Sequence, residues 1–203
     1  TSGSEGGARS HPSFLPLSSN RPTMQKSEIR PGQSPLVTVI TAVHNGEKYL
    51  AQAIDSIRRQ TFNDWEYLVV NDGSTDGTAR ILEEQARLEP RLRIIQHAVA
   101  LGHFPSANLA LGESRGRYIV RLDADDLARP QRIKRQVGFL EKNPGIKGVF
   151  SHALQIDTNG VPTGFVYAPP GRSEVLKWSL CLHCFLIHSS VCLDRQTLVE
   201  RGG

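Results

Sequence analysis

The sequence is poor in several features that mark particular classes of protein. It contains three cysteines and one methionine, and aromatic residues make up 6% of it. The cysteines, Cys181, Cys184 and Cys192, are odd in number and share one short segment, so we expect no disulfide framework and a reducing compartment. No apolar run is long enough to cross a bilayer and no signal peptide is evident. These absences predict a cytoplasmic protein with, at most, a peripheral contact with the inner membrane face.

The excess of positive charge is also small. The formal net charge is +4, and half of that excess lies in residues 1–34, which hold four basic and two acidic side chains. What is left is too little and too dispersed to indicate binding of nucleic acid. Hydrophobic residues make up 38% and charged residues 22% of the chain, which is typical of a globular protein.

The chain divides into a tail and one domain. Residues 1–34 are rich in Ser, Gly, Pro and Arg and show no hydrophobic periodicity, so we predict that they are disordered. The only methionine, Met24, lies in this tail, and we hypothesise that translation begins there. Residues 35–203 are predicted to form the domain.

Strands and helices alternate from Pro35 onward. Apolar, β-branched runs predict strands at residues 36–42, 65–70, 92–96 and 117–122. Apolar residues at helical spacing predict helices at 47–60, 76–88, 106–113 and 131–142, and Pro130 suits the start of the last one. Further on, the pattern predicts a turn at Asn159-Gly160, a helix at 173–180, a strand at 187–193 and a helix at 195–200. This order predicts an α/β fold, a mainly parallel sheet flanked by helices on both faces, as in Rossmann-like folds.

Polar segments follow three of the predicted strands, at residues 41–46, 71–77 and 123–126. Ligands of open parallel sheets bind at the carboxyl ends of strands, so these segments are expected to meet at one edge. Two of them are acidic, which suits a divalent cation held between carboxylates and a diphosphate. If the segment is extended, Asp123 and Asp125 point the same way, and Ala124 keeps the backbone approach open. The cation would neutralise the leaving diphosphate.

Each polar segment also has a simpler explanation. Taken alone, residues 71–77 are typical of a turn followed by a helix cap, and Asp125 and Asp126 have the composition of a cap for the next helix. Three such segments at successive strand ends nevertheless favour a ligand site.

Other candidate side chains carry weaker signals. Cys181, His183, Cys184, His188 and Cys192 have a spacing that fits no paired-cysteine zinc pattern. We interpret His97 and His103 as ordinary loop residues. The basic residues Arg132, Lys134 and Arg135 are interpreted as the solvated face of a helix.

Four segments together resemble the family 2 glycosyltransferases. They are residues 37–45 (VTVITAVHN), 60–62 (QTF), 70–78 (VNDGSTDGT) and 116–126 (GRYIVRLDADD), with a further match at 187–191 (IHSSV). The order and spacing of these motifs make the resemblance specific, and it extends from about Pro35 to the end of the chain.

The resemblance implies a type A glycosyltransferase fold, a nucleotide-diphosphate sugar donor, with UDP favoured, Mg²⁺ or Mn²⁺, and inversion at the anomeric carbon. The acceptor would be a glycan or a lipid-linked molecule of polysaccharide or cell-wall synthesis. Thr41 and Ala42 would border the base, Asp72 would bond to it, Asp123 would lie near the ribose or the metal, and Asp125 would ligate the metal. The expected substrate-binding residues are Thr41, Ala42, His44, Asn45, Glu47, Asp72, Ser74, Asn108, Asp123 and Ala124, and the expected metal ligands are Asp125 and Asp123.

The sequence departs from the family pattern at two places. Ala107 stands where many relatives have an arginine, and Arg121, Arg129 and Arg132 are the candidates to replace that cation. The family's catalytic base follows the segment that resembles residues 198–203, so the resemblance implies a base beyond Gly203 and a chain, truncated before that motif, that binds donor but transfers sugar poorly.

Two other functions are weighed against this one. A non-catalytic nucleotide-sugar-binding pseudoenzyme is an alternative because the base motif is missing. A sugar-phosphate nucleotidyltransferase has a similar sheet, but it opens with a Gly-rich phosphate loop carrying Arg and Lys where this sequence has residues 41–45 (TAVHN).

Overall fold

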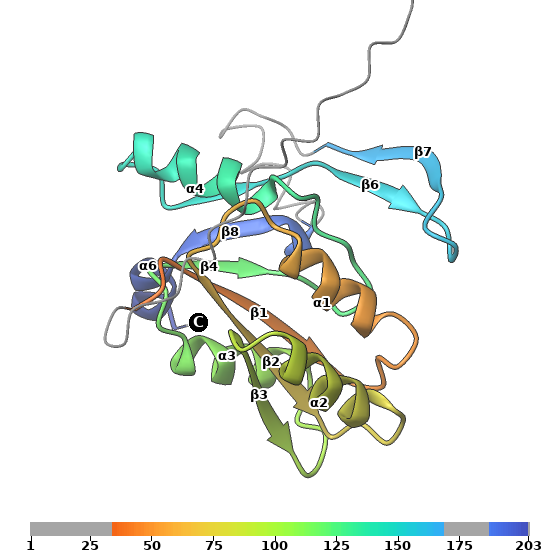
Figure 1. Cartoon of the computed structure of the whole chain (residues 1–203). Helices are drawn as coiled ribbons and strands as arrows, with labels where there is room; N and C mark the ends of the chain where they lie inside the picture. The colour runs from red at the N-terminus through yellow and green to blue at the C-terminus, as the bar shows by residue number, and fades with distance from the viewer. Residues whose placement is uncertain (1–33, 169–186, 203) are drawn as a thin grey trace, which may run out of the picture.

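A six-stranded sheet forms the centre of the computed structural model, which describes residues 34–168 and 187–202. The strand order is β3-β2-β1-β4-β8-β5, and the first four strands are parallel to one another. Strand β8 is antiparallel to both of its neighbours (Figure 1). The strands are β1 (Val37–Val43), β2 (Trp65–Asp72), β3 (Leu92–His97), β4 (Tyr118–Arg121), β5 (Gly148–Phe150) and β8 (Val191–Asp194). The prediction of a mainly parallel sheet is confirmed.

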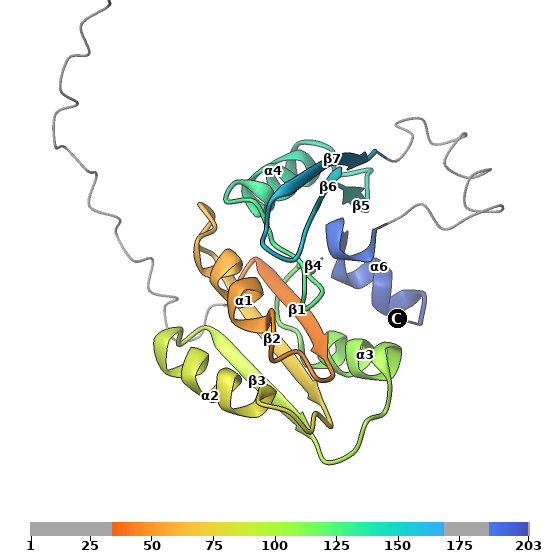
Figure 2. The same cartoon turned by 90° about the vertical axis from the view of Figure 1, so that its right-hand side faces the viewer.

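Helices cover both faces of this sheet. They are α1 (Leu50–Arg58), α2 (Thr78–Leu88), α3 (His103–Glu113), α4 (Arg132–Lys142) and α6 (Arg195–Glu200). Alternate residues of β1 point to opposite faces: Val37, Val39 and Val43 join the large core with α1, α2 and α4, whereas Ile40 joins the smaller core beside α3. Figures 1 and 2 show α3 on the other side of the sheet from α1 and α2. Of the described helices, none is long and apolar enough to cross a membrane.

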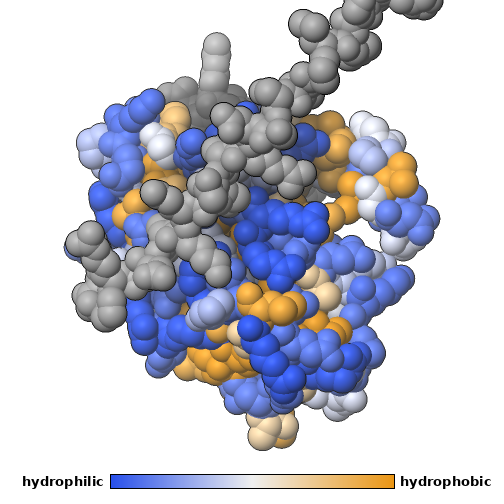
Figure 3. Space-filling model, in the orientation of Figure 1, coloured by the Kyte–Doolittle hydropathy of each residue, from blue (hydrophilic) through white to orange (hydrophobic). Residues whose placement is uncertain are grey.

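A separate hairpin projects beyond the main sheet. It consists of β6 (Ala153–Ile156) and β7 (Pro162–Tyr167), paired antiparallel. The turn at Asn159-Gly160 is confirmed: Gly160 has a φ of +81° and its N–H donates to the carbonyl of Asp157 over 2.9 Å. All of β7 is exposed, and Figure 3 shows apolar residues on this hairpin as well as other apolar patches on the same face.

Most of the predicted elements are present, with a few shifts. Helix α4 begins two residues after Pro130, whose carbonyl instead accepts a hydrogen bond from the N–H of Thr61. The predicted strand at 187–193 is wrong in its first half, where His188–Ser190 form a 3₁₀ turn before β8. The predicted helix at 173–180 lies outside the described residues.

Candidate functional site

The loops that follow β1 and β2 are bonded to each other through reciprocal hydrogen bonds. The N–H of Asn45 donates to Ser74 Oγ (2.9 Å), and the side-chain carbonyl of Asn45 accepts from the N–H of Thr75 (2.8 Å). The N–H of Glu47 donates to Asp76 Oδ2 (3.0 Å), while its carboxylate accepts from the N–H of Gly77 (3.1 Å). Asn45, with a φ of +56°, makes the sharp bend that presents both of its polar groups. The structure therefore brings Asn45, Glu47 and Ser74 together.

Asp72 lies at the end of β2 and holds the loop that follows β3. Its carboxylate accepts hydrogen bonds from the N–H groups of Leu101 and Gly102 (each 2.8 Å) and from His97 Nδ1 (3.0 Å). Its backbone carbonyl lies 2.7 Å from Nδ1 of His44, whose side chain is exposed. His97 is thus wrongly interpreted as an ordinary loop residue. These three bonds fill most of the roughly four acceptor positions of the buried carboxylate, and the hydroxyl of Ser106 also acts on it as a hydrogen-bond donor.

The titration of Asp72 is expected to contribute to stability. Burial raises the pKa of this carboxyl group, but the hydrogen bonds from Leu101, His97 and Gly102 outweigh burial and hold the pKa well below its ordinary value. A group with a lowered pKa in the folded state stabilises the fold above its ordinary pKa, and that stabilisation is lost progressively as the pH falls below it. The charged form of Asp72 therefore favours the folded state near neutral pH.

Replacement of Asp72 by asparagine is expected to cost about 1.5–3 kcal/mol at pH 7, as for hydrogen bonds to a charged group. The difference in free energy of unfolding from the native chain should shrink as the pH falls below about 4, because the unfolded native chain then takes up the proton. Urea unfolding of both proteins from pH 7 to pH 3 measures this. A difference that stays constant over that range would contradict the assignment.

The end of β4 lies beside the end of β1. The buried hydroxyl of Thr41 bonds to the carbonyl of Leu122 and lies 2.8 Å from the hydroxyl of Tyr67. A Cβ placed on Gly46 would lie 3.7 Å from the Cβ of Ala124, so the first loop also reaches the acidic segment. Ala42 is half-buried one residue along the same strand. Thr41, Ala42 and Ala124 therefore lie together at the carboxyl ends of β1 and β4, as predicted from the positions of their segments after the strands.

The acidic segment is a turn and not an extended strand. Strand β4 ends at Arg121, and the N–H of Asp126 donates to the carbonyl of Asp123 (3.2 Å). The expectation that Asp123 and Asp125 alternate along an extended segment is wrong, because this bond bends the chain at Ala124 and Asp125. The Asp123 side chain is 36% exposed, and Asp125 is exposed.

The carboxylates of this turn suit a divalent cation. Burial raises the pKa of Asp126, and the nearby negative charges of Asp125 and Asp123 raise it further. A cation would relieve that repulsion, and oxygen donors are the ligands that Mg²⁺ and Mn²⁺ prefer. Within residues 34–168 and 187–202, no three His, Cys, Asp or Glu side chains are grouped so as to hold a metal. A cation held by Asp125 and Asp123 would thus draw its other ligands from substrate phosphates and water.

Arg121 connects this turn to α3 and to the 3₁₀ turn. Its guanidinium donates to Asp123 Oδ1 (3.2 Å), to Nδ1 of His188 (3.4 Å) and to Nε2 of His103. His103 is therefore also wrongly interpreted as an ordinary loop residue. Burial and the adjacent Arg121 lower the pKa of His103, which favours the neutral ring that can accept this bond. Arg121 is the last residue of β4, and Asp123 lies just beyond the strand, within hydrogen-bonding distance of the guanidinium.

A cavity of about 300 Å³ opens beside Arg121. Its other lining residues include Phe104, Ala107, Asn108, His188 and Leu198, from α3, the 3₁₀ turn and α6. Asn108 is exposed on α3 and lies in this cavity and outside the hydrogen-bonded loops described above. The structure thus places Asn108 on the Arg121 side of the site.

The structure also bears on two side chains that were interpreted from the sequence, Arg132 as part of a solvated helix face and Cys192 as one residue of a zinc alternative. Arg132 is not part of a solvated face: its guanidinium lies beneath the site and donates to the carbonyls of Arg121 (2.8 Å) and Val191 (3.2 Å). Cys192 is buried in the large core, and burial raises the pKa of its thiol to about 12. The remaining cysteines of the zinc alternative, Cys181 and Cys184, lie outside the described residues.

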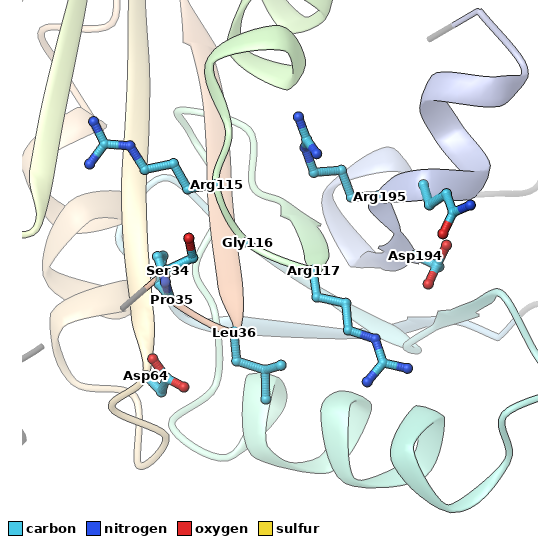
Figure 4. Close-up of a pocket in the computed structure, with 10 residues that line it drawn as sticks. Ser34, Pro35, Leu36, Asp64, Arg115, Gly116, Arg117, Asp194 and Arg195 are labelled. Atoms are coloured by element: carbon cyan, nitrogen blue, oxygen red, sulfur yellow. The ribbon is translucent and has the colours of Figure 1, made fainter. Parts of the chain in front are cut away.

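A second cavity, of about 500 Å³, lies at the amino ends of the parallel strands. Leu36, Asp64 and Arg117 line it just before β1, β2 and β4 begin (Figure 4). The acidic turn, by contrast, follows the carboxyl end of β4. Its arginines are partly engaged, since Arg117 pairs with Glu141 (2.9 Å) and Arg195 donates to Ser114 Oγ (2.9 Å). Ligands of parallel sheets bind at the carboxyl ends of strands, so this cavity is not the candidate site.

The sheet, its acidic edge and its flanking helices define a nucleotide-sugar transferase fold, and comparison with known proteins agrees. The family model described as "Glycosyl transferase family 2" matches residues 38–191. The chain belongs to this family.

Individual relatives match parts of longer proteins. An uncharacterized glycosyltransferase of Haemophilus influenzae is 44% identical over 118 residues, which are 58% of this chain and 36% of that protein. The structure of S. aureus TarS 1–349 with UDP superposes with a TM-score of 0.50 at 29% identity, covering 53% of this chain and 32% of that one. The mannosyltransferase PcManGT of Pyrobaculum calidifontis, in complex with GDP-Man and Mn²⁺, superposes with a TM-score of 0.62 at 23% identity over 85% of this chain and 48% of that one. The chain therefore spans less than half the length of these relatives and has their type A glycosyltransferase fold.

Proposed function

We propose that this domain binds a nucleotide-diphosphate sugar, with a UDP-sugar favoured, through a divalent cation and takes part in inverting transfer of the sugar to a hydroxyl of a glycan or lipid-linked acceptor. The observation that carries the proposal is the acidic turn Asp123–Asp126 at the carboxyl edge of the parallel sheet. Membership of family 2 supports sugar transfer. The presence of UDP in the structure of TarS, which is 29% identical, supports the choice of nucleotide.

Different segments of the site would contact different parts of the donor. The loops after β1 and β2 would hold the nucleoside, with Thr41 and Ala42 beside the base, Asp72 bonded to it, and His44, Asn45, Glu47 and Ser74 keeping the two loops in place. Asp123, Ala124 and Asp125 would face the diphosphate, and Asn108 would border the sugar side. Bound Mg²⁺ or Mn²⁺ supplies positive charge that stabilises the departing nucleoside diphosphate. Because Asp72, Asp123 and Asp125 are assigned to nucleotide and metal, we propose none of these three as the catalytic base.

Calorimetric titration with UDP, GDP and TDP tests the proposal. In Mn²⁺ we expect saturable binding of UDP with one site per chain, weaker binding of the other two nucleotides, and loss of binding when EDTA removes the metal. The matched control is uridine, which has the base and ribose without phosphates and should be insensitive to EDTA. Absence of binding for all three nucleotides would refute the proposed function.

A further inference from the structure

The acidic turn needs a fixed cation if it is to hold a diphosphate. Asp123, Asp125 and Asp126 bring three carboxyl groups to the place where the phosphates would lie. One divalent metal ion does not neutralise those groups together with a nucleoside diphosphate, so negative charge remains. Phosphate sites in proteins are commonly completed by arginine, whose planar guanidinium offers five N–H donors.

Three arginines lie close to the turn in sequence, and the structure shows that their guanidinium groups or backbones have different surroundings. The guanidinium of Arg132 is engaged by the carbonyls of Arg121 and Val191, where it holds β4 against β8. Arg129 follows the turn, and its carbonyl accepts a hydrogen bond from Gln60 (2.8 Å) near the end of α1, on the face away from α3. Only Arg121, of these three, lines the cavity beside Ala107.

Arg121 is held in a defined position with donors left over. Its side chain is 18% exposed, and three of its N–H donors are directed to Asp123, His103 and His188. Nη2 serves both Asp123 and His103, and Nη1 serves His188, so the Nε–H and one N–H of Nη1 have no partner among the described residues. Each of these two donors can bond singly to a ligand oxygen. The small side chain of Ala107 lines the same cavity, at the position where the family resemblance implies an arginine.

We propose that Arg121 binds the diphosphate of the nucleotide-sugar donor and supplies the positive charge that Ala107 cannot. This inference rests on the proposed function. His103 and His188 act as positioning residues, because each bonds to the guanidinium and keeps it beside Asp123. The site thereby recognises the donor by its phosphates from the α3 side, while the loops after β1 and β2 recognise the nucleoside.

Binding of UDP and of uridine to Arg121→Ala separates the two parts of the donor. In Mn²⁺ we expect the dissociation constant for UDP, measured by calorimetry, to rise about 10- to 100-fold, and that for uridine, measured by NMR titration, to change less than about twofold. Arg129→Ala is the matched control and should leave both constants within about twofold. The double variant Ala107→Arg/Arg121→Ala should recover most of the UDP affinity, since the new guanidinium would enter the same cavity.

Each alternative outcome has a definite meaning. If UDP binds Arg121→Ala as well as it binds the native chain, Arg121 does not contact the diphosphate. If the affinities of the variant for UDP and for uridine fall by the same factor, Arg121 only supports the fold, and the inference fails. Arg121→Gln, which keeps a hydrogen bond to Asp123 without the charge, gives the same test should the alanine variant not fold. If the native chain binds no nucleotide at all, the proposed function fails and this inference with it.

Discussion

Replacement of Asp125 by asparagine is expected to weaken Mn²⁺-dependent binding of UDP at least 10- to 100-fold, the range seen when even an outer partner of a metal site is lost. The carboxylate of Asp125 is exposed and, in the described part of the chain, makes no hydrogen bond. Its loss should therefore leave the fold intact while it removes a charged oxygen ligand from the cation. Calorimetric titration with UDP in the presence of Mn²⁺ measures the effect.

Glu83→Gln is the charge-matched control for this variant. Glu83 is exposed on α2 and makes no described hydrogen bond, so its replacement removes one negative charge at a distance from the turn. UDP affinity should be unchanged in this control. Binding of UDP by the native chain that persists after chelation of the metal would refute the role given to Asp125.

Replacement of Trp65 by alanine is expected to lower the free energy of unfolding by about 3–5 kcal/mol, a larger loss than for any of the other variants. Trp65 is fully buried at the start of β2, and the guanidinium of Arg91 lies 3.5 Å from the centre of its ring. The substitution leaves a large cavity in the core shared with α1 and α2 and removes the cation–π contact. Thermal unfolding should show a midpoint lowered by roughly 2–4 °C for each kcal/mol lost.

Phe139→Ala is the control, because that ring is 46% exposed on α4 and its removal should cost less than about 1 kcal/mol. A conservative Trp65→Phe variant should fall between the two, since it keeps most of the apolar volume. Equal unfolding midpoints for Trp65→Ala and the native chain would mean that β2 is not packed as described.

Local sequence pattern was sufficient to predict most of the fold. The four parallel strands and α1 to α4 follow from apolar periodicity, because one face of each helix and both faces of each central strand are buried. The pairing of β8 was beyond such reasoning. Its position between β4 and β5 is set by packing of residues far apart in the sequence, and a four-residue strand carries little periodicity of its own.

The general position of the site was predictable because the carboxyl ends of parallel strands lie on the same side of the sheet. The hydrogen bonds between its side chains were not predictable from the sequence. The link from His97 to Asp72 and that from His103 to Arg121 join residues on different elements, and a lone histidine in a loop has no spacing that indicates its partner. The turn at Asp123–Asp126 was missed because two aspartates in alternation are equally compatible with a strand end and with a turn.

The place of β8 has a consequence for the order in which the molecule can assemble. Strand β5 ends at Phe150, yet its only described hydrogen-bonded neighbour, β8, begins at Val191. During synthesis the sheet of β3, β2, β1 and β4 can therefore form while β4 still presents an unpaired edge, and β5 has to wait for the later strand. Non-local pairing of this kind is slow, and an open edge invites association with other chains. In the nascent domain, the edge of β4 is thus the site most prone to association with other chains until residues 191–194 have been synthesised and pair with it.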